Sequence, residues 1–246
     1  SIRTRNAVYL IVLLSFLEIF FFARTMRPTF VPDWTGLQNL TAFFAARPGD
    51  YRILNPFEPN SALTTGARDI WGYDPGVSLR YARFVAYTQG EDPDGATQYV
   101  KIHRYHPWFR LLRCRYVFSQ TAQGPRIQEF PDVLPRLLLV QDWKPAKGMH
   151  EAFAIMSERG FDPRATVVLE ENPEPVPAPS GGGGSIEILD SSTDHLTVFA
   201  RLTGASILLL TDAYSRGWRA RSLVGSVQET YRLLPADYAL MAVPLS

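Results

Sequence analysis

The hydrophobic pattern begins with an unbroken apolar run. Residues 7–23 read AVYLIVLLSFLEIFFFA and carry one charged residue, Glu18. A helix rises about 1.5 Å per residue, so this run and its flanks nearly match a hydrocarbon core of about 30 Å. A signal peptide has a shorter apolar region and small residues at its exit, whereas this run leads into the basic RTMRPTF. We therefore expect residues 1–27 to form a membrane anchor that stays attached, the alternative being a buried core helix.

Apolar residues at helical spacing dominate residues 28–171, where we expect a mixed α/β domain. They predict helices within 33–50, 73–87 and 149–163, and a helical turn that passes into a strand within 106–120. Asp74 is expected to cap the second of these helices, and Gly160 to close the third.

The last third of the chain consists of short apolar or alternating runs separated by turn signals. They predict strands at 165–171, 185–190, 195–202, 205–212, 218–224, 227–234 and 238–245. Their spacing is close to that of an antiparallel β-sandwich, which we place at 186–246 and which can share strands with 164–171. Residues 172–185, NPEPVPAPSGGGGS, are interpreted as a Pro/Gly linker or surface loop. The expected fold class is thus α+β, mainly β with some α.

Composition narrows the classes of function. The formal net charge is +1, which provides no basic field for a phosphate backbone, so nucleic acid is not expected as a partner. The single cysteine, Cys114, excludes an intrachain disulfide framework and a cysteine-rich metal site. A short basic leader before the apolar run and a large domain of low net charge after it favour an extracytoplasmic domain on a single span.

Few residues suggest chemistry. His103 and His106 are separated by two residues, a spacing that could hold a metal from a turn, but a zinc site needs a third and usually a fourth ligand. The acidic pairs Asp69 and Asp74, and Glu170 and Glu171, would need a cleft between them to act as glycosidase carboxylates. The sequence has no Gly-x-Ser-x-Gly elbow, Walker loop or dinucleotide fingerprint. We expect no catalytic residue, no metal site and no cofactor.

Aromatic residues next to glycine or proline are candidates for sugar stacking. They are Trp71, Tyr73, Tyr214 and Trp218. Filling a core is the commoner use of such rings, and we favour it at each place. The stretch TDAYSRGWRAR, residues 211–221, is interpreted as a turn between two strands, with Trp218 facing the core.

Several stretches, taken together, resemble a known family. They are RILNPFEPNSALTTGARDIWGYDPGVSLRY, LLRCRYVF, RGFDPRATVVLEE, LTDAYSRGWRAR and VQETYRLLPADYALMAVPL. In this order they resemble the C-terminal part of the bacterial YfhO-like membrane proteins, polytopic proteins related to lipid-linked sugar transferases. The resemblance covers most of the chain from Tyr51 to Leu245, and the preceding span resembles the last part of the family's membrane region.

The resemblance implies an extracytoplasmic domain of a membrane protein but assigns no catalytic residue here. The acidic residues of the family's sugar transfer are expected in loops between N-terminal spans, which this sequence does not contain. Arg216 stands where the family commonly has a proline before Gly-Trp. The first residue is not methionine, so two interpretations remain open: a fragment of a longer protein, or a module reused on a single anchor.

The function expected from these observations is that of a non-catalytic, single-span subunit in the inner membrane. The bulk of the chain would lie on the periplasmic side and pack on a larger integral-membrane protein complex. Glu18, a carboxyl within the span, and Arg216 are the expected partner contacts. The alternative is a C-terminal accessory domain of a YfhO-like transferase that holds a lipid-linked sugar, with the catalytic region elsewhere.

Overall fold

The computed structural model describes most of the chain. The described residues are 2–26, 35–72, 74–121, 124–177 and 183–246. They divide into two compact units, Ser1–Ala42 and Phe43–Ser246. Helix α2 (Thr35–Ala45), expected from its apolar spacing, runs across the division.

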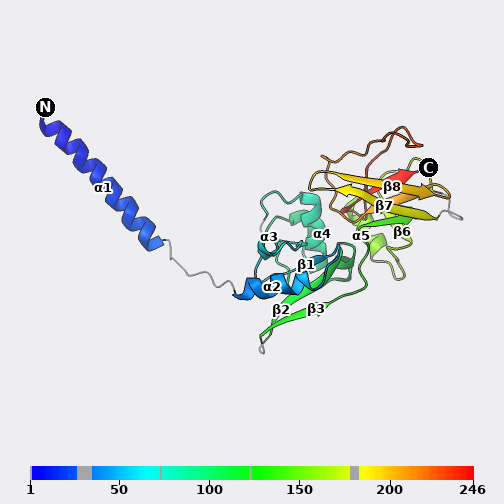
Figure 1. Ribbon diagram of the computed structural model, residues 1–246, viewed down its shortest axis with the longest axis horizontal. Helices are drawn as coiled ribbons and strands as arrows, with labels where there is room; N and C mark the ends of the chain where they lie inside the picture. The colour runs from blue at the N-terminus through cyan, green and yellow to red at the C-terminus, as the bar shows by residue number, and fades with distance from the viewer. Residues whose placement is uncertain (1, 27–34, 73, 122–123, 178–182) are drawn as a thin grey trace. The chain divides into compact units, whose positions relative to one another are not determined.

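Helix α1 (Ile2–Met26) forms the first unit with the start of α2, and it is blue in Figure 1. Its segment Arg5–Met26 has a mean hydropathy of 2.1, and none of its most apolar window is buried within the protein. The helix is therefore long and apolar enough to cross a bilayer, a property shared by a membrane anchor and a signal sequence. Glu18 lies on this helix with an exposed side chain.

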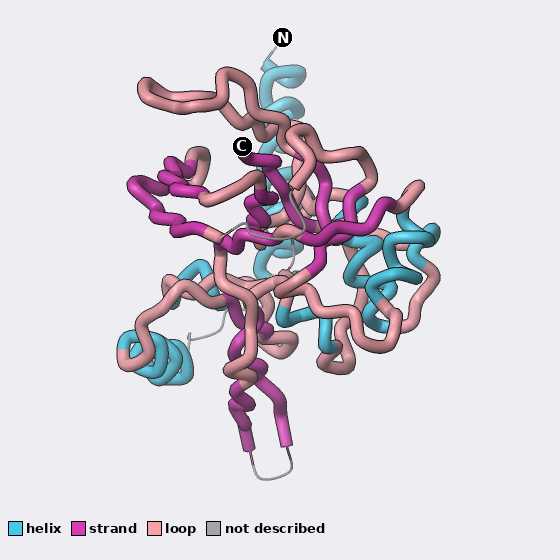
Figure 2. The backbone as a smooth tube through the Cα atoms, turned by 90° about the vertical axis from the view of Figure 1, so that its right-hand side faces the viewer, coloured by secondary structure: helices cyan, strands magenta, loops and turns pink. Residues whose placement is uncertain are grey.

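A curled, six-stranded sheet forms the centre of the second unit (Figures 1 and 2). Its strands in spatial order are β4 (Leu137–Val140), β9 (Ser206–Leu210), β11 (Leu240–Leu245), β10 (Leu234–Ala236), β6 (Thr166–Leu169) and β5 (Asp142–Pro145). Neighbours run antiparallel except β5 and β6, which are parallel. Strands that precede and strands that follow residues 172–185 thus lie in one sheet. The expected sharing between the two regions was limited to residues 164–171, but β4 and β5 also take part in it.

A hairpin of β7 (Gly184–Ser191) and β8 (Leu196–Leu202) covers one face of this sheet. Along β9 the side chains alternate: Leu208 and Leu210 face the cluster that includes β8, whereas Ile207 and Leu209 join the core on the opposite face. Both faces of β9 are covered, which explains why SILLL is apolar at nearly every position. Two strands against a curled sheet do not clearly form the β-sandwich expected at 186–246, although the mixed α and β content agrees with the prediction.

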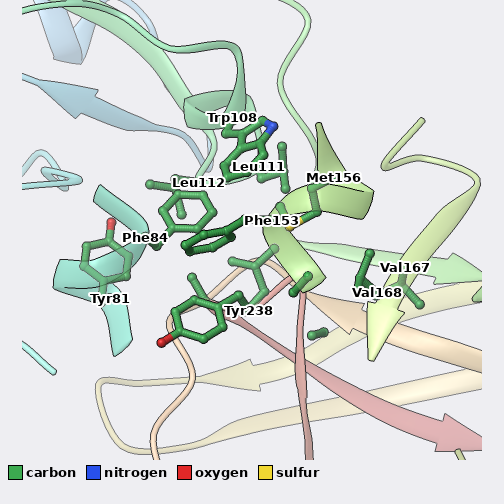
Figure 3. Close-up of a cluster of buried hydrophobic side chains, with 14 of the residues drawn as sticks. Tyr81, Phe84, Trp108, Leu111, Leu112, Phe153, Met156, Val167, Val168 and Tyr238 are labelled. Atoms are coloured by element: carbon green, nitrogen blue, oxygen red, sulfur yellow. The ribbon is translucent and has the colours of Figure 1, made fainter. Parts of the chain in front are cut away.

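Helices cover the opposite face. They are α4 (Leu79–Gln89), the 3-10 helix η2 (Pro107–Arg110) and α5 (Met149–Met156). Figure 3 shows their aromatic side chains gathered in one cluster with the turn before β11. The Phe153 ring centroid lies 4.9 Å from that of Tyr238, and Trp108 stacks on Tyr87 at 4.9 Å. This cluster attaches the helices to the sheet.

The predicted helix within 73–87 begins later than expected. Ser78, rather than Asp74, caps α4 by accepting a hydrogen bond from the Tyr81 backbone N–H. Asp74 instead accepts one from the Gly76 N–H within the preceding turn, at 2.7 Å. The helix within 149–163 ends at Met156, before the predicted Gly160.

A smaller, three-stranded sheet lies beside the helices. It contains β1 (Arg52–Leu54), β2 (Cys114–Thr121) and β3 (Gly124–Glu129), and the β2–β3 hairpin projects from the body in Figure 1. Phe43 packs edge-on against Tyr116 of β2, with 5.2 Å between ring centroids. Short helices α3 (Ser61–Thr65) and η1 (Pro93–Gly95) complete the described elements.

The strand predicted at 218–224 does not form, and of 227–234 only Leu234 joins a strand, β10. The strands before and after this segment, β9 and β10, already have two strand partners each. Residues 211–233 therefore have no free edge of either strand to extend, and they follow an irregular path. The stretch 211–221 is consequently not a turn between two strands.

Candidate functional site

The irregular residues 211–233 enclose a cleft of about 470 Å³. Its lining combines aromatic, guanidinium and carboxylate groups from Tyr214, Trp218, Tyr231, Arg216, Arg219, Arg232 and Glu171. We call this the aromatic cleft. It brings together residues that are up to about sixty positions apart in the sequence, since Glu171 follows β6 whereas Arg232 precedes β10.

The three rings of the aromatic cleft are anchored in the protein. Tyr214, Trp218 and Tyr231 are half-buried and pack against the apolar cluster between the hairpin and the sheet. Each ring thus packs on the core and also lines the cleft. The side chain of Arg216 is exposed at the opening. The cleft therefore presents anchored aromatic surfaces beside exposed positive charges.

Backbone hydrogen bonds hold this segment in place. The Tyr214 N–H donates to the Ala239 carbonyl at 2.8 Å, which attaches the segment to the start of β11. The Trp218 N–H donates to the Ser215 carbonyl at 3.2 Å, and the Gly217 N–H to the Ser215 hydroxyl at 3.2 Å. These bonds form a local turn that orients Trp218 toward the cleft.

Arg80 of α4 supports the cleft from behind. Its guanidinium lies 5.4 Å from the Tyr214 ring centroid and 4.1 Å from that of Tyr238. It also forms an ion pair with Glu170 and donates to the Tyr238 carbonyl. Burial lowers the pKa of Arg80 from its usual value, and the neighbouring Arg216 acts in the same direction. Arg80 thus connects the helical layer to the wall of the cleft.

Asp212, at the start of the same segment, lies at the centre of an ionic network. Its carboxylate accepts hydrogen bonds from Arg52 and Arg113, each at 2.6 Å, and from Arg136 at 2.9 Å. Arg113 is 1% exposed and also pairs with Asp50 at 2.7 Å. Burial by itself raises the pKa of Asp212, but the arginines outweigh it and hold the pKa below its usual range. We call Asp212 and its three arginines the Asp212 network.

The residues singled out in the sequence separate into two groups. Tyr214, Trp218 and Arg216 meet in the aromatic cleft. Trp71 lies elsewhere, half-buried and stacked on Tyr81 with 6.2 Å between ring centroids. Tyr73 lies outside the described residues.

Sequence reasoning did not single out three other members of the aromatic cleft, Arg219, Tyr231 and Arg232, and it considered Glu171 only as part of an acidic pair. Tyr231 and Arg232 fell within an expected strand, where their alternation with apolar neighbours was interpreted as sheet pattern. The same interpretation covered Arg219. A signal was present in the high arginine and aromatic content of 214–232, which is unusual for a strand pair facing a core.

His106 and the acidic pair Glu170 and Glu171 make hydrogen bonds or ion pairs that hold the fold together. The His106 ring accepts a hydrogen bond from the Trp108 N–H at 3.2 Å and caps η2, and burial lowers its pKa to about 4. Glu170 pairs with Arg80 and Glu171 with Arg232. Among the residues that the structure describes, no group of three or more His, Cys, Asp or Glu side chains is arranged to hold a metal ion.

Comparison with known proteins gave no match among protein-family models, curated proteins or solved structures.

Proposed function

We propose that this chain is a non-catalytic, membrane-anchored subunit that packs on a larger integral-membrane protein complex. In this proposal α1 is a retained anchor in the inner membrane, and Phe43–Ser246 lies on the periplasmic side. The aromatic cleft is the main contact of this unit with the partner. Within the membrane, α1 contacts the partner through Glu18.

The observation that carries the proposal is the composition of the aromatic cleft. Tyrosine, tryptophan and arginine are the residues most enriched at the energetic centres of protein interfaces. Here Tyr214, Trp218 and Tyr231 are held by the core while Arg216 and Arg219 extend beside them. Rings that are already fixed lose little conformational entropy on binding, so they favour a specific contact.

Features of α1 support the membrane part of the proposal. The described side chains of α1 are exposed and mostly apolar, so its surface is available to lipid or to another helix. Apolar contact alone does not associate helices within lipid, since lipid tails are equally apolar. A carboxyl such as Glu18 is costly there unless it has a partner or a polar cavity, so it selects a position against a neighbouring helix.

The test is purification of the tagged full chain from native membranes in mild detergent, with partners identified by cross-linking. We expect an integral-membrane protein to co-purify in constant proportion and to be lost from the Arg216→Glu and Arg219→Glu double variant. The Arg126→Glu and Arg159→Glu double variant, which reverses two exposed arginines outside the cleft, is the matched control and should retain the partner. A chain that elutes as a partner-free monomer would contradict the proposal.

The second candidate is the accessory domain of a YfhO-like transferase. The same rings, Tyr214 and Trp218, can stack on sugars, and a cleft of about 470 Å³ falls within the usual range of ligand pockets. A gene encoding many further spans upstream would support this candidate. If Trp218→Ala changes neither the stability of the full chain nor its binding to a glycan array, the aromatic cleft does not bind sugar.

A further inference from the structure

A second cleft lies on a different part of the same unit, with a volume of about 430 Å³. Its lining is made of three arginines, the carboxylate of Asp50, the rings of Phe44 and Tyr51, and several small or apolar residues. The arginines are Arg47, Arg68 and Arg136. We call it the arginine cleft; it shares no lining residue with the aromatic cleft.

The arginine cleft is continuous with the Asp212 network. Arg136 belongs to both, since it lines the cleft and donates to Asp212 at 2.9 Å. Asp50 links them a second time, because it pairs with the buried Arg113 at 2.7 Å and with Arg68 at 2.9 Å. The positive charges of the network therefore act on the cleft, through protein that screens charge less than water does.

Charge is not balanced in this region. Cleft and network together contain Arg47, Arg52, Arg68, Arg113 and Arg136. The carboxylates of Asp50 and Asp212 balance two of these five charges, which leaves an excess of three. Asp50 is the only carboxylate in the described lining of the cleft, and Asp190, next to the lining residue Ser191, is already paired with His195 at 2.8 Å.

Arg47 and Arg68 are the groups most available to a ligand. The described contacts of the Arg47 side chain are a 3.3 Å hydrogen bond to the Phe43 carbonyl and stacking on the Phe43 ring, and no carboxylate is within ion-pair distance of it among the described residues. The Arg68 side chain is 58% exposed, and Asp50, its partner, is shared with Arg113. Both guanidinium groups can therefore turn toward an anion without breaking the Asp212 network.

We propose that the arginine cleft binds a phosphate-bearing ligand. Guanidinium groups present planar pairs of N–H donors that match phosphate oxygens, and hydrogen bonds between two charged groups are the strong ones. The small residues Gly49, Gly66 and Ala67 leave room for the anion, and the Phe44 and Tyr51 side chains offer apolar surface to the group that carries it. A phospholipid headgroup and a soluble phosphate ester both supply this chemistry.

The experiment uses the full chain in neutral detergent at constant ionic strength, with pyrophosphate as the probe and sulfate-free chloride buffer as reference. We expect millimolar pyrophosphate to raise the midpoint of thermal unfolding. In the Arg47→Gln and Arg68→Gln double variant the affinity measured by calorimetric titration should fall about tenfold or more, as expected for the loss of charge-assisted hydrogen bonds. The matched control Arg126→Gln and Arg159→Gln removes two exposed arginines outside the cleft and should bind like the parent.

The source of the phosphate is decided by two further probes, short-chain phosphatidylglycerol and glycerol phosphate. Tighter binding of phosphatidylglycerol than of glycerol phosphate assigns the cleft to a lipid headgroup, and equal affinities assign it to a soluble ester. Either result supports the proposal if it depends on Arg47 and Arg68. If the double variant fails to fold, Arg47→Gln alone is compared, because its side chain has no ion pair among the described residues. A parent chain that binds none of these probes, or variants that bind them as the parent does, would overturn the proposal.

Discussion

Replacing Asp212 by asparagine tests whether the Asp212 network stabilises the fold. The change keeps the size of the side chain but removes the charge that three arginines share at 2.6, 2.6 and 2.9 Å. Arg113 is 1% exposed, so its charge cannot be solvated in place, and Arg52 and Arg136 are each 15% exposed. Removing one partner of a buried ion pair costs about 3–5 kcal/mol. Because Asp50 still pairs with Arg113, we expect a loss at the lower end, about 3 kcal/mol.

The measurement is urea unfolding of the full chain in neutral detergent, followed by tryptophan fluorescence and circular dichroism. Asp132→Asn is a close control: Asp132 also accepts from two arginines, Arg110 at 2.6 Å and Arg164 at 2.8 Å, but its side chain is 64% exposed. Solvent screening limits such surface pairs to under about 1 kcal/mol. The reasoning is refuted if Asp212→Asn costs less than about 1 kcal/mol, or no more than Asp132→Asn.

Other substitutions and reagents test the rest of the structure. Phe84→Ala removes a fully buried ring and should lower the free energy of unfolding by about 3–5 kcal/mol, whereas half-buried Trp218→Ala should cost about 2 kcal/mol in the same urea assay; the reverse order would contradict the assigned burial. Burial raises the pKa of Asp237 to about 7, so the folded state keeps a proton that the unfolded chain releases near pH 4, and stability should fall as pH rises between these values by up to about 1.4 kcal/mol per pH unit. Asp69 adds a similar slope because burial raises its pKa to about 7, so Asp237→Asn should reduce the pH dependence of unfolding without abolishing it, and an unchanged slope would argue against a buried Asp237. The Cys114 thiol is 0% exposed and its pKa is raised by burial, so Ellman's reagent should react with it at a measurable rate after unfolding and not before.

Local patterns predicted those elements whose partners lie close in the chain or whose faces are unambiguous. The helical spacing of apolar residues within 73–87 correctly predicted α4, and the residues at that spacing, Tyr81, Phe84 and Val85, are buried. Alternation and β-branched content located β7, β8, β9 and β11 to within about two residues. The sequence drew attention to Tyr214, Arg216 and Trp218 within 211–221, but it did not predict that they would line one cleft.

Strand pairing and ion pairs between residues far apart in the chain could not be predicted from the pattern of neighbouring residues. An alternating run such as 227–234 forms a long strand only where the edge of a neighbouring strand is free. Both edges of β9 and both edges of β10 are already paired with other strands. From the sequence, Asp212 was interpreted as part of a turn. No residue next to it in the chain indicates that Arg52, Arg113 and Arg136 bind its carboxylate. Ion pairs between such distant residues depend on which strands become neighbours in the fold.

The sequence by itself determined the low net charge, which depends on composition alone. It also determined the apolar helix at the N-terminus and the position of most helices and strands, because these depend on the side chains of one short segment at a time. The tertiary structure decided that β4, β5 and β6 share one sheet with β9, β10 and β11, and that a hairpin and a helical layer cover its two faces. It also decided that rings and arginines from distant segments enclose two clefts. The physical reason is that burial depends on the whole chain. Each apolar face is buried only by packing on another element, and the charged groups that are enclosed between these elements are stabilised only by pairing with one another.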